Sequence, residues 1–321
     1  MGRQICINAQ LIDAETDKHL WAERFDGDTS DLFALQDEIT SRIAVTLGIE
    51  LIRAEAARQV QHPDALDYTL RGRAILLSKL RTRDTYAERT SIFERALALD
   101  PESVEAQGQL AAVLAGRVMD NMTGTAAADI LRAQDFAGRA LVAAPHSGLA
   151  HYAKGQVLRA QRRFAEAIPE YETVLGLDRN FVRAFLALGQ SKLYTGSIEE
   201  VIPLMERAIR LSPRDPNIGR FGLVHLLQSR TDEATIWLEK ARNADAAHAN
   251  LRPFLASAYA LAGESERGAA ELAEARRLSL DDRYSSLARL RAVGYWGVPK
   301  IHALFEATYF AGLRKAGMPE E

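Results

Sequence analysis

The sequence lacks several features that point to common functional classes. Cys6 is the only cysteine among 321 residues, which excludes an internal disulfide and a cysteine zinc cluster and is typical of a reducing compartment. No apolar run approaches the ~20 residues needed to cross a bilayer. Residues 1–10 lack the basic start and apolar stretch of a signal peptide. We therefore expect a cytoplasmic protein with no membrane partner.

An excess of charge of one sign is also missing. The chain holds 40 basic and 43 acidic residues, which gives a formal net charge of −3. Such a balance produces no general field that attracts nucleic acid. We expect no nucleic-acid partner.

Sequence patterns of catalysis and of metal binding are absent as well. There is no glycine-rich phosphate loop after a strand and no nucleophile elbow. The seven histidines show no helical metal spacing. In the acidic run from Asp26 to Asp31, Asp31 stands where a calcium loop needs glycine, so capping of the following helix is the better interpretation. The sequence predicts a non-enzymatic chain without cofactor or metal.

A repeated pattern occupies the centre of the chain. Two consecutive blocks of 34 residues start at Gly148 and Val182. Their eighth, twentieth and twenty-fourth places hold Gly155, Ala167 and Tyr171 in the first block and Gly189, Val201 and Met205 in the second. Small residues at two of these places indicate close helix crossings.

The twenty-seventh place extends the register in both directions. It holds Ala96, Ala140, Val174, Ala208, Ala241 and Ala275, at steps of 44, 34, 34, 33 and 34 residues. This pattern resembles the tetratricopeptide repeat (TPR), in which each unit is a helix hairpin that needs its neighbours to bury its apolar face. The resemblance implies a mainly α fold, an α-α superhelical solenoid with six hairpins in residues 64–280. The long step is explained by the loop 119–125, which is either a binding element or a tolerated insertion.

The first 60 residues differ from the repeats. Alternation in residues 4–11 predicts a strand, residues 19–25 a second antiparallel strand, and residues 32–59 a helix. Gly48 is a candidate position for a kink in that helix. Because a lone hairpin buries too little surface to be stable, we expect that the chain begins inside a domain.

The amino-acid sequence of this segment resembles the end of the TolB-like α/β domain. The resemblance rests on Arg3-Gln4-Ile5-Cys6-Ile7-Asn8-Ala9-Gln10-Leu11, His19-Leu20-Trp21-Ala22-Glu23-Arg24-Phe25 and Asp31-Leu32-Phe33-Ala34-Leu35. It implies that residues 1–60 are the remnant of such a domain. Bacterial proteins of this arrangement often carry an upstream class III adenylate or guanylate cyclase domain, or a winged-helix DNA-binding domain. Residues 305–321 also resemble the end of cyclase-associated TPR proteins.

Residues 281–321 predict one or two further helices after the repeats. Leu304, Tyr309 and Leu313 are candidates to cover the open end of the stack.

The resemblance to TPR proteins also implies a binding groove on the inner surface, formed by the first helix of each repeat. The register assigns to it Arg73, Tyr152, Gln156, Arg159, Arg183, Leu186, Gln190, Leu223 and Ser257, with Tyr194 adjacent. Arginines suit carboxylates, and tyrosine and leucine offer apolar contact. The alternative for each residue is an ordinary solvated position on a helix. The lysine and asparagine clamp of chaperone-binding members is not reproduced.

Three functions follow from these observations. The first is a non-catalytic scaffold that binds a protein or peptide in the groove. The second is the regulatory region of a class III nucleotide cyclase, and the third is the regulatory arm of a winged-helix transcription factor. An unpaired edge on the strand that holds Ile5 and Ile7 also predicts a homodimer through the hairpins.

Overall fold

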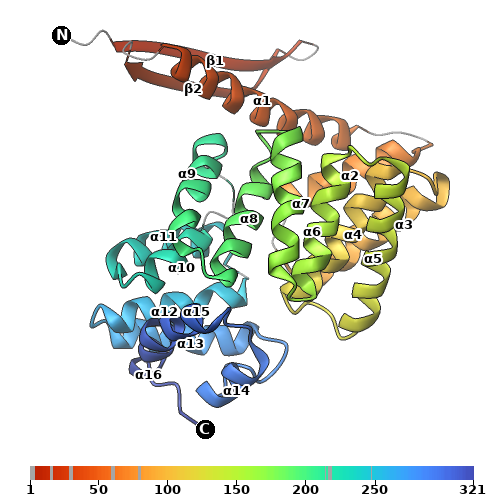
Figure 1. Cartoon of the computed structure of the whole chain (residues 1–321). Helices are drawn as coiled ribbons and strands as arrows, with labels where there is room; N and C mark the ends of the chain where they lie inside the picture. Colours follow the sequence, from red (N-terminus) through yellow and green to blue (C-terminus); the bar gives the residue numbers. More distant parts are fainter. Residues whose placement is uncertain are drawn as a thin grey trace.

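An antiparallel hairpin and one long helix form the N-terminal part of the molecule (Figure 1). The computed structural model describes residues 4–14, 17–28, 32–58, 62–78, 81–213, 215, 219–246 and 248–321. Strand β1 (Gln4–Asp13) pairs with β2 (Lys18–Asp28), with a register shift between Leu11 and Ile12. Helix α1 (Leu32–Ala57) follows and runs through Gly48 as one helix. The predicted capping residue Asp31 lies outside the described residues.

The hairpin packs against α1 through a small apolar and cationic contact. Phe25 and Ile39 are only 5% and 6% exposed. The Arg42 guanidinium lies 4.8 Å from the centroid of the Phe25 ring and forms an ion pair with Glu23. Burial of one apolar face by α1 supplies the contact that a two-stranded sheet needs.

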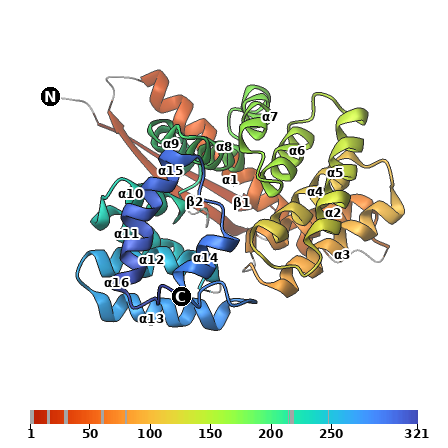
Figure 2. The same ribbon diagram turned by 60° about the horizontal axis from the view of Figure 1, so that its bottom comes forward.

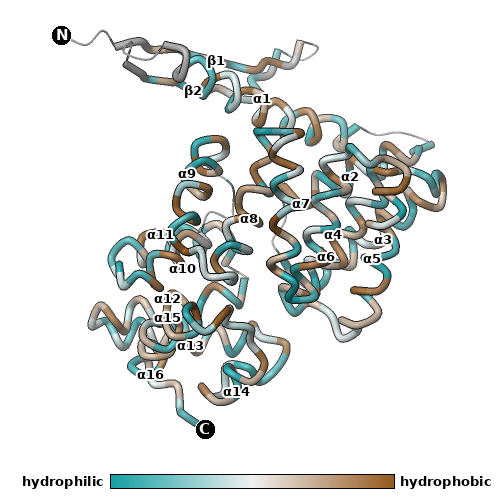
Figure 3. Tube along the Cα trace, viewed as in Figure 1, coloured by the Kyte–Doolittle hydropathy of each residue, from teal (hydrophilic) through white to brown (hydrophobic). Residues whose placement is uncertain are grey.

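Pairs of antiparallel helices make up the rest of the chain. Their bounds are α2 (Ala65–Ser78) with α3 (Arg83–Leu99), α4 (Val104–Met119) with α5 (Ala126–Ala143), α6 (Gly148–Ala160) with α7 (Phe164–Leu177), α8 (Val182–Thr195) with α9 (Val201–Leu211), α10 (Arg220–Leu227) with α11 (Thr231–Ala244), and α12 (Arg252–Leu261) with α13 (Ser265–Leu278). Apolar and polar stretches alternate along these helices (Figure 3), because each helix buries one face against its neighbours. The fold is the predicted mainly α solenoid with an N-terminal β-hairpin.

The predicted register is visible at the end of every second helix. The backbone carbonyls of Ala96, Ala140, Val174, Ala208, Ala241 and Ala275 each accept the N–H of the residue that caps the helix four positions later. All six of these side chains are at most 2% exposed. The sequence period therefore marks one repeated structural position, where a small side chain lets neighbouring helices approach.

The two glycines of the central repeats differ in how tightly they are packed. A Cβ atom added to Gly155 would lie 2.6 Å from the Tyr171 ring, whereas one added to Gly189 would lie 3.4 Å from Val201. Only the first distance is a clash. Close packing at the eighth place is therefore strict at Gly155 and relaxed at Gly189.

Local side-chain chemistry fixes several helix ends. Thr82 and Thr85 form a reciprocal capping box at the start of α3. The hydroxyl of Ser103 accepts the N–H of Ala106 at the start of α4. α3 ends at Leu99, and its C-cap Asp100 directly precedes Pro101, as the sequence predicts.

The C-terminal segment folds back onto the last repeats. It comprises α14 (Leu287–Val293), α15 (Pro299–Phe305), one π-helical turn (Glu306–Phe310) and α16 (Ala311–Lys315). α16 packs against α12 (Figure 2). Tyr309 and Leu313 are buried at 2% and 0% exposure, and Leu304 is half-buried against the same cluster. The division into 1–60, 64–280 and 281–321 stays a prediction.

Candidate functional site

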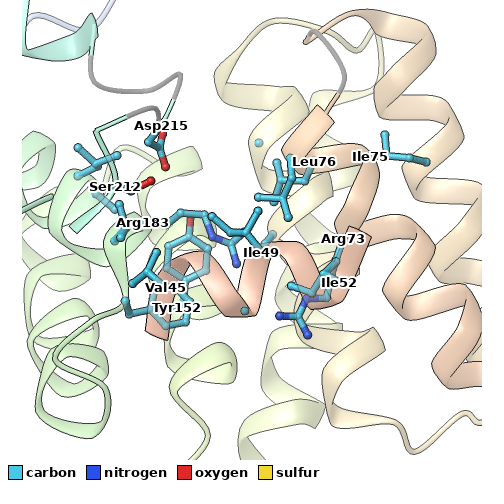
Figure 4. A pocket seen from close by; sticks show the side chains of 18 of the residues that line it. Val45, Ile49, Ile52, Arg73, Ile75, Leu76, Tyr152, Arg183, Ser212 and Asp215 are labelled. Atoms are coloured by element: carbon cyan, nitrogen blue, oxygen red, sulfur yellow. The ribbon is translucent and has the colours of Figure 1, made fainter. Parts of the chain in front are cut away.

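The first helices of the early repeats and α1 surround a large cavity. Its volume is about 990 Å³, and its walls come from α1, α2, α3, α4, α6 and α8, with residues of β2 and of the loops after α7, α9 and α11. Val45, Ile49 and Ile52 of α1 lie along one side, opposite Tyr152 and Arg183 of the repeats (Figure 4). The volume is at the upper end for small-molecule pockets and leaves room for a short peptide segment.

Six of the ten groove residues predicted from the register line this cavity. They are Arg73, Tyr152, Gln156, Arg159, Arg183 and Leu186. Gln190 lies beside them, since its side-chain carbonyl accepts a hydrogen bond from Arg159. Tyr152, Arg159 and Leu186 are only 5–6% exposed. The expectation of solvated helix residues is therefore wrong for these three.

The other three predicted residues do not line the cavity, because they pack in the core or against the C-terminal segment. Ser257 is fully buried, and a Cβ atom added to Gly312 of α16 would lie 2.1 Å from its hydroxyl. Tyr194 packs its ring against Phe164 and Tyr295. Leu223 belongs to the core beside the last repeats. The sequence assigned these residues to an open groove because the repeat pattern contains no information on what folds over it.

A hydrogen-bonded network connects the polar residues of the cavity wall. Arg159 donates to the Gln156 side-chain carbonyl at 2.6 Å, and the Tyr171 hydroxyl donates to the same oxygen at 3.1 Å. The Gln156 amide donates to the Tyr152 hydroxyl. These buried bonds hold the Tyr152 ring and the Arg159 guanidinium in fixed positions.

Arg183 is held by aromatic rings. Its guanidinium lies 5.0 Å from the centroid of Tyr152 and 5.4 Å from that of Phe181, which is cation–π geometry. No ion pair or hydrogen bond of the Arg183 side chain is found within the described parts of the chain. Its donors therefore remain available to a ligand.

A second polar cluster joins the two ends of the solenoid. Arg81 lies 3.2 Å from Asp120, whose carboxylate also accepts the Tyr86 hydroxyl at 2.7 Å. The Arg81 backbone N–H donates to Asp245 at 3.4 Å, and the Asn250 amide donates to the Asp120 backbone carbonyl at 3.4 Å. Residues more than a hundred positions apart thus meet beside the cavity.

Charge and burial change the pKa values in this cluster. Burial raises the pKa of Tyr86 well above its usual value, and the Asp120 carboxylate raises it further. Burial lowers the pKa of Arg81, but Asp120 and its neighbours raise it more, so the net shift is upward. The cluster therefore holds Arg81 charged and Tyr86 protonated.

Sequence reasoning missed this cluster, although one signal pointed to it. Asp120 is the first residue after α4, in the loop that produces the long step of 44 residues between Ala96 and Ala140. The structure gives this residue a contact with the opposite end of the solenoid. An irregular repeat length was the only sequence sign of it.

Among the described residues, no group of three or more His, Cys, Asp or Glu side chains is arranged to hold a metal ion. No helix in the described part of the chain is long and apolar enough to cross a membrane. The cavity therefore offers hydrogen bonds, guanidinium groups and apolar contacts.

Comparison with known proteins identifies the repeat. Residues 149–181, which span α6 and α7, match the family model of the tetratricopeptide repeat. These residues form a TPR hairpin. Human IFIT1 in a dimer with m7Gppp-AAAA has a TM-score of 0.55 at 16% identity, covering 77% of this chain and 57% of that one. The APC/C hetero-tetramer Cut9-Hcn1 has the same TM-score and identity, covering 84% and 59%. At this identity the likeness shows the TPR fold alone.

One curated relative matches part of the sequence. It is a putative adenylate cyclase 3 of Rhizobium meliloti, which is 31% identical over 170 residues. The match covers 52% of this chain and 29% of the relative. The chain thus spans less than a third of the length of that protein.

Proposed function

We propose that this chain is a non-catalytic scaffold that binds a peptide segment of a partner protein in the cavity between α1 and the repeats. The cavity supports this proposal because it combines apolar walls with fixed hydrogen-bonding groups. Leu76, Val182 and Leu186 supply apolar surface, and Tyr152 and Arg183 supply polar groups. Protein and peptide partners are also what TPR folds usually bind.

The test is a selection of peptides from a phage-displayed random library on the immobilised protein. Leu76→Glu places a carboxylate in the cavity, and the matched control Leu131→Glu places one on the outer face, where Leu131 is 68% exposed. We expect the wild type and L131E to enrich the same peptides and L76E to lose them. Equal enrichment by all three proteins would exclude the cavity as the site.

A second candidate function is favoured by the match to the adenylate cyclase. We propose that the TPR region acts as the regulatory part of a class III nucleotide cyclase whose catalytic domain is encoded upstream. In this proposal the order β1, β2, α1 is the end of a TolB-like domain. The test is to read the genomic frame upstream of Met1 and, if it encodes a cyclase domain, to measure cyclic nucleotide formation by the full protein with and without L76E. Equal rates of cyclic nucleotide formation by the wild type and by L76E would contradict a regulatory role of the cavity.

We also propose self-association through the hairpin. Ile7 and Ile12 are 39% and 37% exposed on a sheet that has two strands in the described structure, and such an edge is a template for pairing with another chain. Sedimentation of the wild type is expected to show a dimer that Ile7→Lys disrupts and Leu51→Lys, on the exposed side of α1, leaves intact. A wild-type monomer at high concentration would contradict the proposal.

A further inference from the structure

One arginine in the cavity wall is buried without a partner. Arg89 of α3 is only 8% exposed, and its Nε is completely enclosed. No hydrogen bond or ion pair of its side chain is found among the residues that the structure describes. The Tyr86 ring, 5.9 Å from the guanidinium carbon, is the aromatic group beside it. A buried charge in this state costs stability unless a counter-charge reaches it.

The other arginines of the cavity fall into two groups. Arg42, Arg53, Arg73 and Arg81 each form an ion pair with a carboxylate of the chain. Arg159 instead donates to the amides of Gln156 and Gln190, and Arg183 stacks on rings. Three guanidinium groups thus form no ion pair with a carboxylate of the described residues, namely those of Arg89, Arg159 and Arg183.

All three groups line the cavity, and two of them are joined to Tyr152. Arg183 stacks on its ring, and Arg159 is joined to it through Gln156. The pKa of Arg89 is lowered to about 10, chiefly by burial and also by the positive charges of Arg183 and Arg81, while Tyr86 and Tyr152 act in the opposite direction. The repulsion between like charges in the cavity wall decreases when an anion binds between them.

We propose that Arg89, Arg159 and Arg183 form a subsite in the cavity for one carboxylate of a bound peptide, either an acidic side chain or the C-terminal carboxylate. Guanidinium groups match carboxylates in geometry, and bonds to charged groups are stronger than neutral ones. This inference rests on the proposed function, because it names the chemistry that the bound peptide carries.

The rest of the cavity favours an anion of low charge over a polyanion. Asp120, Asp178, Asp215 and Asp245 also line the walls, and the whole chain carries a formal net charge of −3. A polyphosphate chain would approach these carboxylates and be repelled. A peptide with a single carboxylate and apolar side chains on either side of it would contact Tyr152, Phe181 and Leu186, which line the cavity together with the arginines.

The first test is thermal unfolding in sodium acetate and in sodium chloride at equal ionic strength, with Arg89→Gln and the control Arg277→Gln. Arg277 lies on α13 with its side chain 67% exposed. We expect acetate to raise the unfolding midpoint of the wild type and R277Q but not of R89Q. Without acetate, R89Q should unfold at the same temperature as the wild type or higher, because it lacks the unpaired charge. An R89Q protein that is less stable and responds to acetate like the wild type would show a structural role and overturn the proposal.

The second test measures binding of three synthetic heptapeptides by calorimetry. The first is Ala-Leu-Ala-Asp-Ala-Leu-Ala with blocked ends, the second has Asn in place of Asp, and the third is the Asn peptide with a free C-terminus. Stronger binding of the first or of the third than of the second identifies the source of the carboxylate. We expect R89Q to weaken the preferred peptide about tenfold or more and to leave the second unchanged.

The outcomes separate this inference from the proposed function. Equal binding of all three peptides by wild type and R89Q would overturn the subsite and leave a peptide-binding cavity. Stabilisation by inorganic phosphate but not by acetate would also overturn the carboxylate assignment. A library selection that enriches no peptide on the wild type would remove the proposed function itself.

Discussion

Whether a helix crossing tolerates an added methyl group depends on the distance from that group to the facing side chain. Gly155→Ala would place a methyl group 2.6 Å from the Tyr171 ring, while Gly189→Ala would place one 3.4 Å from Val201. We expect G155A to lower the free energy of unfolding by about 1–3 kcal/mol. G189A should be neutral or stabilising by up to about 1 kcal/mol, because alanine is the better helix former. Urea unfolding of both variants checks this, and an equal loss would contradict it.

Asp129 is a buried carboxylate with a defined counter-charge. It is 2% exposed and forms an ion pair with Arg117 at the start of α5. Burial raises its pKa, but the bonds from Arg117, Thr123 and Thr125 lower it more, so the net shift is downward. The carboxylate therefore contributes stability that is complete above the ordinary Asp pKa of 3.8 and is lost as the pH falls through its lower folded value.

The corresponding prediction concerns Asp129→Asn. We expect it to cost roughly 3 kcal/mol at pH 7, because Arg117 is left without its partner. The difference from the wild type should shrink as the pH falls below 3.8, because the carboxyl of the unfolded chain then binds a proton while the folded one, with its lowered pKa, still resists it. Urea unfolding at pH 7 and at pH 3 measures this. Asp135→Asn, at an exposed position of the same helix, is the control and should change little at either pH.

At the scale of elements, α1 is the unit whose position determines the cavity. Val45 packs against the core beside α8 and α9, and Asp37 forms an ion pair with Arg179 at 2.8 Å. At its other end Arg53 donates to the Leu77 backbone carbonyl at 3.4 Å. The helix thus bridges separate repeats and closes one side of the cavity.

Val45→Asp tests the docking of α1. A carboxylate in this apolar contact is expected to loosen the helix, so amide hydrogen exchange in residues 39–54 should be faster while exchange in α6 stays unchanged. Leu51→Asp is the matched control, because Leu51 is 58% exposed on the same helix. Identical exchange in both variants would show that α1 is not held by this contact.

At the scale of the whole molecule, the solenoid is closed by contacts between its two ends. The bonds from Arg81 to Asp120 and Asp245 join the first two hairpins to the end of α11. A chain of repeats in which each unit contacts only its neighbours would lack such bonds. The closure keeps the cavity walls together.

Removing the closure should open the superhelix. We expect Asp245→Ala, which removes the carboxylate that accepts the Arg81 backbone N–H, to cost about 1–3 kcal/mol and to increase the radius of gyration measured by X-ray scattering. Arg132→Met removes an exposed ion pair with Glu94 on the outer face and should change neither quantity. An unchanged radius in D245A would contradict the role of this bond in closing the ring.

The sequence by itself determined the repeats. Periodic small residues such as Ala208 and Gly155 record helix crossings that recur at fixed intervals, and these contacts are local in the chain. The strands, the long helix and the end of α3 at Leu99 were predictable for the same reason, since alternation, helical period and proline act over a few residues.

Only the tertiary structure decided what encloses the inner surface. Ser257 and Leu223 occupy groove positions by register, yet α16 and the core cover them; Tyr152 and Arg183 face a cavity whose opposite wall is α1. The ion pair of Arg81 with Asp120 and the unpaired charge of Arg89 also depend on segments brought together across the superhelix. Such contacts leave no period in the sequence, because each involves side chains that meet once, at a distance set by the curvature of the whole stack.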